Sequence, residues 1–295
     1  MTYPQIWQTW FFAFSVLVAV LMTFLMQPTL NTQLLLLVPT IAILGLPHGA
    51  LDLPIAQALW PLHGWRGNMR FGLLYVGLTA LVIGFWILLP GPALFAFLIY
   101  SAFHFSGDWD DATPLLRWTG GVATIGAPGL FWQAEVSDLF VLLAPAPAAD
   151  LAAMALAYAG GTALACYIAI LVSQPASRTR AAVEQAIIWF AAACLAPLVY
   201  FILYFCALHS LRHLTDALQS VENTRKALRA ATVLSAVVVV VAALIGFAVL
   251  QTAETFILEQ SIMQVVFIGL AGLTVPHMLL IDRFQRHGRR LPCER

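Results

Sequence analysis

Nine continuous apolar runs decide what this chain can fold into, because each is roughly the 20 residues that a helix needs to cross a bilayer. They lie at residues 8–26, 33–52, 71–89, 92–109, 118–143, 151–173, 184–208, 231–250 and 259–281. Apolar residues make up 61% of the chain and charged residues only 9%, against about 25% charged in a soluble domain. Backbone polar groups must be satisfied internally in lipid. We therefore predict an all-α, polytopic integral membrane helical bundle, with residues 1–295 forming a single domain.

The first and fifth runs affect the number of spans. The first lacks a basic leader and a small-residue cleavage site, so we expect a retained span rather than a signal peptide. The fifth contains "GAPGLFWQAEVSD", whose Gly, Pro and acidic residues are unusual for a simple crossing. It is re-entrant, a surface helix or two short pieces. We predict about eight spans, with nine or ten as the alternatives.

Net charge and cysteine usage remove several classes of function. The formal net charge is zero, which gives no reason to expect a nucleic-acid partner. The four cysteines are scattered and form no CxxC pair. The sequence therefore indicates neither a disulfide framework nor a zinc ribbon nor a redox motif.

Five of the seven histidines lie near the ends of apolar runs. They are His48, His104, His209, His213 and His277. The other two, His63 and His287, stand beside arginines in hydrophilic loops, and we expect ordinary solvated side chains there. All five reach one side of the membrane only if an even number of spans lies between residues 110 and 208, so the fifth run must not make a single crossing.

The distribution of basic residues tests this topology independently. The side with the five histidines would carry twelve of the 14 lysines and arginines, leaving only Arg178 and Arg180 opposite. A nine-span count instead splits them roughly five to nine. Because basic residues concentrate on cytoplasmic loops, we predict eight spans, both termini in the cytoplasm and the histidines near the cytoplasmic side.

The spacing of these histidines is typical of a metal site. His209 and His213 in "HSLRH" are four residues apart, so a helix directs both imidazoles to one point. His48 and His104 would supply two further ligands from neighbouring helices, and His277 is either a fifth ligand or a pocket residue. Neutral imidazole binds Fe, Zn, Cu or Ni. We expect carboxylates near the ligands to accept their remaining ring N–H groups, and the candidates are Asp52, Asp108 and Asp216.

Aromatic residues surround the predicted histidine site. They either form an interfacial belt, which is common at membrane surfaces, or line a slot for a long apolar ligand. The candidates for the slot are Tyr100, Phe103, Phe105, Trp109 and Tyr204.

Four stretches together give the chain a family resemblance. "PHGALD", "FHFSGDW", "HSLRH" and the late "PHM", between residues 47 and 278, resemble the Brp/Blh family of membrane β-carotene 15,15′-dioxygenases of bacteria and archaea. The resemblance implies an O₂-dependent enzyme that cleaves the central double bond of β-carotene into two all-trans-retinal molecules at a non-haem Fe(II). Its iron ligands would be His48, His104, His209 and His213.

The same resemblance implies the substrates, the membrane location and a partner of the protein. Its substrates would be β-carotene and O₂, its solvent the lipid of the inner cell membrane, and a retinal-binding opsin a functional partner. Two other classes stay open from the residues themselves. One is a di-iron desaturase or hydroxylase, which needs more histidines than five unless Asp52 and Asp108 also bind metal. The other is a non-enzymatic haem- or metal-binding membrane protein.

Overall fold

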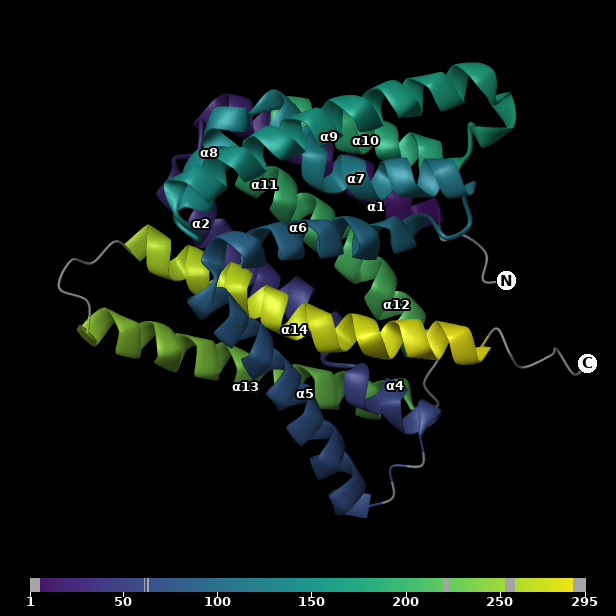
Figure 1. The fold of residues 1–295 in the computed structure, drawn as a ribbon. Coiled ribbons are helices and arrows are strands. Elements are labelled where there is room, and N and C mark those ends of the chain that lie inside the picture. Colours follow the sequence, from purple (N-terminus) through teal and green to yellow (C-terminus); the bar gives the residue numbers. More distant parts are fainter. Residues whose placement is uncertain (1–5, 61, 63, 220–222, 253–257, 289–295) are drawn as a thin grey trace, which may run out of the picture. The chain divides into compact units, whose positions relative to one another are not determined.

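The computed structural model describes residues 6–60, 62, 64–219, 223–252 and 258–288, and every regular element in these ranges is a helix (Figure 1). This confirms the all-α class. The chain forms two compact units. Unit 1 comprises Met1–Ile41 with Leu89–Arg212, and unit 2 comprises Ala42–Leu88 with His213–Arg295. The single domain predicted over 1–295 stays a prediction.

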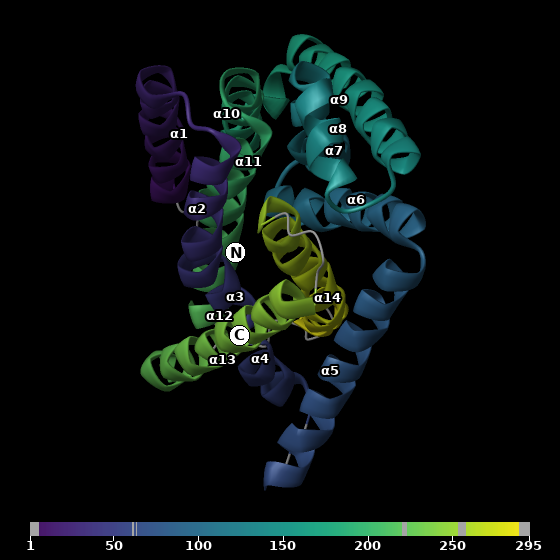
Figure 2. The ribbon, with the colours of Figure 1, turned by 90° about the vertical axis from the view of Figure 1, so that its left-hand side faces the viewer.

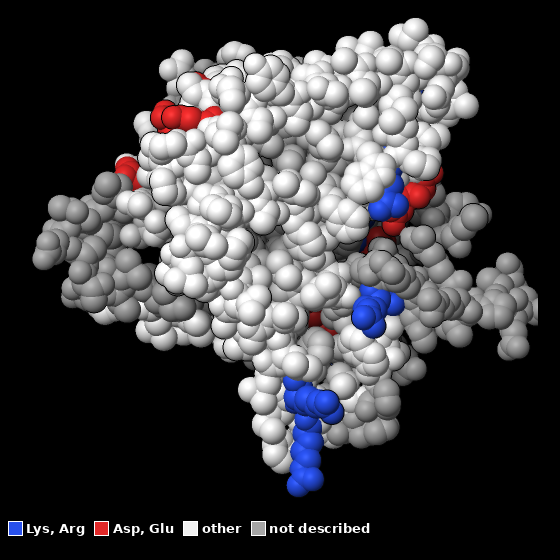
Figure 3. All heavy atoms as spheres, in the orientation of Figure 1, with Lys and Arg blue, Asp and Glu red and all other residues white. Residues whose placement is uncertain are grey.

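Six helices in the described part of the chain are long and apolar enough to cross a membrane. They are Ile6–Met26, Gly64–Leu88, Ala146–Ser173, Pro197–Gln219, Thr224–Leu244 and Leu258–Ile281. The face drawn in Figure 3 carries few charged side chains on the described residues, and large apolar side chains such as Phe24 and Leu88 are exposed, 73% and 79% respectively. The protein is therefore a membrane protein. The count of eight spans stays a prediction, because other predicted spans form shorter helices.

Unit 1 is built from helices α1, α2 and α6 to α11 with short connecting turns. Its elements are α1 (Ile6–Met26), α2 (Leu30–Thr40), α6 (Pro90–Ser106), η2 (Gly107–Trp109), α7 (Pro114–Phe131), α8 (Gln133–Val141), α9 (Ala146–Ser173), η3 (Pro175–Ser177), α10 (Arg180–Cys194), α11 (Pro197–Ile202) and η4 (Leu203–Ser210). Helix α7 packs against α6, α9 and α10 (Figure 1), and α1 lies along α10 (Figure 2). Small residues bring α7 and α9 together, since a Cβ on Gly126 would lie only 2.8 Å from the amide nitrogen of Gly160.

Two predicted runs are divided in the structure. The fifth run forms α7 and α8, which meet at Trp132, so two short pieces is the alternative that holds. The prediction of one continuous segment over 184–208 is wrong. Helix α10 ends at Cys194 and α11 begins at Pro197. Proline has no N–H and restricts the residue before it to extended backbone, which ends the first helix and favours the start of the next.

Unit 2 contains η1 from Ala42 onward, α12 from His213 onward, and five complete helices. The elements are η1 (Ile41–Gly45), α3 (Leu46–Gly49), α4 (Asp52–Leu59), α5 (Gly64–Leu88), α12 (Leu211–Gln219), α13 (Thr224–Thr252) and α14 (Leu258–Gly288). Its core is formed by Leu51, Ile55 and Ala56 packed with Ala231 and Leu280. Helix α14 packs on α5, α4 and α13, and its residue Leu280 lies in the same core as Ile55 of α4.

Two stretches have π-helical hydrogen bonding, with one extra residue in the turn. They are η1, which runs directly into the helix of His48, and η4, which contains His209 and continues without interruption into α12. Such wide turns occur mostly as local irregularities in α-helices and are frequent at functional sites. Both π-helical stretches therefore lie at or directly before a histidine, His48 or His209, in helices that are otherwise regular.

Candidate metal centre

Asp108 and His209 form the centre of the buried polar site in unit 1. Asp108 lies in the short η2 turn after α6, and His209 lies in η4. Nδ1 of His209 is 3.1 Å from both carboxylate oxygens, and the Tyr204 hydroxyl donates to Oδ2 at 2.5 Å. His209 is fully buried and Asp108 is 3% exposed. When the carboxylate is ionised, Nδ1 carries the ring proton and donates it, so Nε2 bears the lone pair that binds a metal.

His213 joins these two residues in a group that offers ligand atoms to one ion. The candidate atoms of Asp108, His209 and His213 all lie within 4.8 Å of one another. The division of the chain into units falls between Arg212 and His213, inside the continuous helix of η4 and α12. Because the helix is continuous, its geometry alone places His213 about one turn after His209. That "HSLRH" directs both imidazoles to one metal ion stays a prediction.

Aromatic rings enclose His209 on several sides. The His104 ring stands edge-on to it with centroids 4.7 Å apart, and the Phe105 ring does the same at 4.9 Å. Phe105 also packs edge-to-face on Tyr204 at 5.0 Å. His104 is only half-buried, so α6 brings it beside His209 while leaving part of its ring accessible. These rings restrict the orientation of the His209 imidazole.

The remaining predicted residues of this region lie in different surroundings. The His48 side chain lies outside what the structure describes, and Asp216 is exposed on α12. Of the predicted slot residues, Phe103 is 47% exposed and Tyr100 is half-buried, whereas Trp109 is fully buried. Their role in a slot stays a prediction.

A second group of the same composition is present in unit 2. Nδ1 of His277 lies 2.7 Å from Oδ1 of Asp52, and the Tyr75 hydroxyl donates to Oδ2 at 2.9 Å. The Tyr75 hydroxyl also lies 3.2 Å from the carbonyl oxygen of Leu273. Asp52 and His277 are 3% and 4% exposed. Asp52 was expected to hold a ring N–H, and the structure gives it the imidazole of His277, 225 residues away in the sequence.

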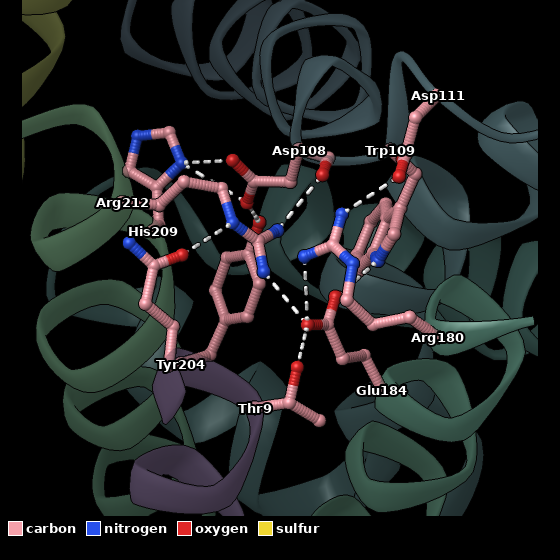
Figure 4. Close-up of polar contacts among 10 residues, drawn as sticks. Thr9, Asp108, Trp109, Asp111, Arg180, Glu184, Tyr204, His209 and Arg212 are labelled. Atoms are coloured by element: carbon pink, nitrogen blue, oxygen red, sulfur yellow. Dashed lines mark hydrogen bonds and ion pairs between the residues drawn. The ribbon is translucent and has the colours of Figure 1, made fainter. Parts of the chain in front are cut away.

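Sequence reasoning missed a buried group of charged residues beside Asp108 (Figure 4). Glu184 on α10 is completely buried and accepts hydrogen bonds from Arg212 at 2.7 Å and from the Trp109 indole at 2.9 Å. Thr9 and Arg180 donate to the same carboxylate at 2.5 Å and 3.1 Å. The signal was present, since a Glu within an apolar run and an Arg between two histidines are expensive in a membrane and indicate function.

The donor set of this site fits a first-row transition metal. Imidazole nitrogens with one carboxylate suit iron, zinc, copper or nickel, whereas magnesium and calcium prefer oxygen ligands only. A histidine whose second nitrogen is held by a carboxylate is the usual arrangement around such metals. His209 and His213, with the Asp108 carboxylate holding Nδ1 of His209, therefore form a site that fits an iron ion.

Comparison with known proteins gives two matches over most of the chain. The model of a family described as "Beta-carotene 15,15'-dioxygenase" matches residues 39–285. A protein of an uncultured marine bacterium, 66A03, named "Beta-carotene 15,15'-dioxygenase", is 31% identical over 264 residues, which cover 85% of this chain and 94% of that protein. No solved structure matches the chain.

Proposed function

This chain belongs to the β-carotene 15,15′-dioxygenase family, and we propose on that basis that it cleaves β-carotene at its central double bond. It is a carotenoid-cleaving dioxygenase in a membrane. In the proposed reaction one O₂ is consumed, the 15,15′ double bond breaks, and each of its two carbons receives one oxygen atom. The products are two molecules of all-trans-retinal.

The observation that carries the proposal is the group of Asp108, His209 and His213, whose ligand atoms lie within 4.8 Å of one another. We propose Fe(II) as the resident metal, held by His48, His104, His209 and His213. His277 is either a fifth ligand or a pocket residue. Bound there, ferrous iron with an open position would supply the activation of O₂.

The protein residues would hold and orient the reactants. Asp108 fixes the ring and tautomer of His209 through Nδ1, so that Nε2 keeps one direction. The rings of Phe105 and Tyr204 pack on or beside this imidazole and exclude water from it. We propose that Tyr100, Phe103 and Trp109 belong with them to the apolar slot. Positioning the central double bond beside the metal lowers the barrier because it removes the freedom of the reactants to misalign.

The membrane is part of the proposed function. β-Carotene dissolves in lipid, so an enzyme with exposed apolar helices can receive it laterally without transferring it through water. We propose an inner-membrane location with both termini in the cytoplasm. Retinal released into the same membrane would reach a retinal-binding opsin, which is the partner we propose.

Expression in cells that accumulate β-carotene tests the reaction. We expect the wild-type chain to bleach the orange cells and to produce all-trans-retinal, identified by chromatography. The His213→Ala chain, present in the membrane in equal amount, should leave the cells orange. Products of a different length, such as apocarotenals from eccentric cleavage, would contradict the proposed position of attack.

Metal analysis of the purified protein tests the cofactor. We expect one iron per chain and no absorption band of haem. Two irons per chain would favour the desaturase or hydroxylase type of site, and a haem spectrum would favour an electron carrier.

A further inference from the structure

We infer that Glu184 is a positioning residue for the metal site, which acts through Arg212 and Asp108 on His209. The inference rests on the proposed function, because it concerns the metal that His209 would hold. Glu184 comes from α10 and is separated from Asp108 by 76 residues in the sequence, so nothing but the fold brings the two together.

The first step is the contact between Glu184 and the segment that carries Asp108. The guanidinium of Arg212 links them, since Nη2 donates to Glu184 at 2.7 Å and Nη1 donates to the main-chain carbonyl of Asp108 at 2.8 Å. Glu184 also accepts the indole N–H of Trp109, the residue next to Asp108. Two consecutive residues of the η2 turn are thus tied to one carboxylate.

Arg180 supports the residues that directly follow η2. Arg180 donates to Glu184 at 3.1 Å and to Asp111 at 3.0 Å, so it connects the buried carboxylate to a residue that is half exposed. The positions of Asp108, Trp109 and Asp111 are therefore all set with reference to Glu184 (Figure 4). The carboxylate of Asp108 is aimed at Nδ1 of His209 by this support.

The charge of Glu184 also affects Asp108 through Arg212. Arg212 is 7% exposed, and a buried cation interacts strongly with every nearby carboxylate because the surroundings screen it poorly. Glu184 supplies the direct ion pair for Arg212 at 2.7 Å. Without that negative charge, the guanidinium would be drawn to Asp108 and would compete with the imidazole N–H for its carboxylate. Glu184 thus keeps the negative charge of Asp108 directed at His209.

A double-mutant cycle of metal affinity tests this inference. Purified wild-type protein, E184Q, D108N and the double variant are titrated anaerobically with Fe(II), and with Co(II), whose visible absorption reports the geometry at the metal. We expect D108N to weaken binding by about 10–100-fold and E184Q by about 10-fold, with an altered Co(II) spectrum. In the D108N background, E184Q should have no further effect, because it acts through Asp108.

Matched variants separate positioning from folding. D150N makes the same acid-to-amide change in the Ser137–Asp150 pair of unit 1, and it should leave metal affinity unchanged. If E184Q fails to fold, E184Q/R212Q removes both charges together, and we expect it to lose less metal affinity than D108N, because no unpaired guanidinium is left to compete for the Asp108 carboxylate. A loss in that variant as large as in D108N would overturn the inference.

The possible failures are distinguishable. Equal affinity of wild type and E184Q, or additive losses in E184Q and D108N, would overturn the role of Glu184 and leave the proposed enzyme intact. A wild-type chain that binds no metal, or a His209→Ala chain that binds it equally well, would overturn the metal site and this inference together.

Discussion

The two His–Asp–Tyr groups of the molecule make the same contacts in different settings. In unit 1, Asp108 receives His209 and Tyr204, and in unit 2, Asp52 receives His277 and Tyr75. Both carboxylates are buried and both hold the Nδ1 atom of an imidazole. The difference lies in their support, because Arg212 and Glu184 fix the turn of Asp108, whereas Asp52 stands at the start of α4 between α5 and α14.

The two settings show how a membrane protein can stabilise a buried carboxylate. Arg212 donates to the main-chain carbonyl of Asp108, and the ion pair of Arg212 with Glu184 balances the charge of that guanidinium, which holds the segment of Asp108 in place. The described hydrogen bonds to Asp52 come from a phenol and an imidazole, and that phenol also contacts the Leu273 carbonyl. We therefore expect substitutions in the unit 1 group to reduce activity and metal binding more than the matching substitutions in the unit 2 group. The following substitutions test this expectation.

The largest expected effect distinguishes the two histidines. His209→Ala should reduce retinal production below detection, because it would remove a proposed ligand from the group of Asp108, His209 and His213, while the protein stays in the membrane. His277→Ala should lower the rate but leave it measurable. Both are measured as retinal per amount of membrane-bound protein in β-carotene-producing cells. If both substitutions abolished retinal production, the two groups would be equally important for activity, and His277 would itself be a ligand.

The next effect compares the two carboxylates. Asp108→Asn should weaken Fe(II) binding by about 10–100-fold, and Asp52→Asn should fall at or below the lower end of that range. The amide keeps the size of the side chain but loses the charge that holds the imidazole N–H. Anaerobic iron titration of the two purified variants gives the comparison. A greater loss in Asp52→Asn would reverse our order of the groups.

A smaller effect compares the two phenols. Tyr204→Phe removes a hydrogen bond to a buried charged group, which is worth about 1.5–3 kcal/mol, and we expect a lower Tm and a few-fold weaker iron affinity. Tyr75→Phe should cost less, because its hydroxyl is 2.9 Å from the carboxylate rather than 2.5 Å and is shared with a carbonyl. Thermal inactivation in detergent measures both. Identical shifts would mean that the shared carbonyl makes no difference.

The smallest effect is expected from the two histidines that the sequence places in hydrophilic loops; His63 and the side chain of His287 lie outside what the structure describes. His63→Ala and His287→Ala should leave retinal production within about two-fold of wild type, the scatter expected for substitutions away from such sites. Initial rates in membranes measure this. An inactive enzyme from either change would show that the chemistry involves residues beyond the two groups.

The apolar runs predicted most of the helices because lipid leaves few alternatives for a backbone. Nearly every helix of the structure overlaps a predicted run, and the failures have local causes. Pro197 breaks the predicted segment over 184–208, and Trp132 separates the two pieces of the fifth run. A hydropathy pattern averages over such single residues, so it finds the run and misses the interruption.

The candidate site was predictable in its residue types but not in its partners. The spacing of His209 and His213 identified one helix face, which any helix would provide. The bonds of Asp52 to His277 and of Asp108 to His209 depend on contacts between elements more than 100 residues apart, which no periodicity contains. Glu184 and Arg212 were visible as charges in apolar surroundings, and only the fold reveals what they hold.

The wide turn of η4 has a consequence for natural and engineered variation of length. The segment Leu203–Ser210 has one residue more than a regular α-helix would have over the same length, and the helix continues directly into α12. Deleting Ser210 would shorten the spacing of His209 and His213 from four residues to three and rotate His213 by about 100° relative to His209, one step of a 3.6-residue turn. The imidazole of His213 would then no longer point to the same place as that of His209. We therefore expect insertions and deletions to be rare in this stretch and tolerated in the hydrophilic connections between spans.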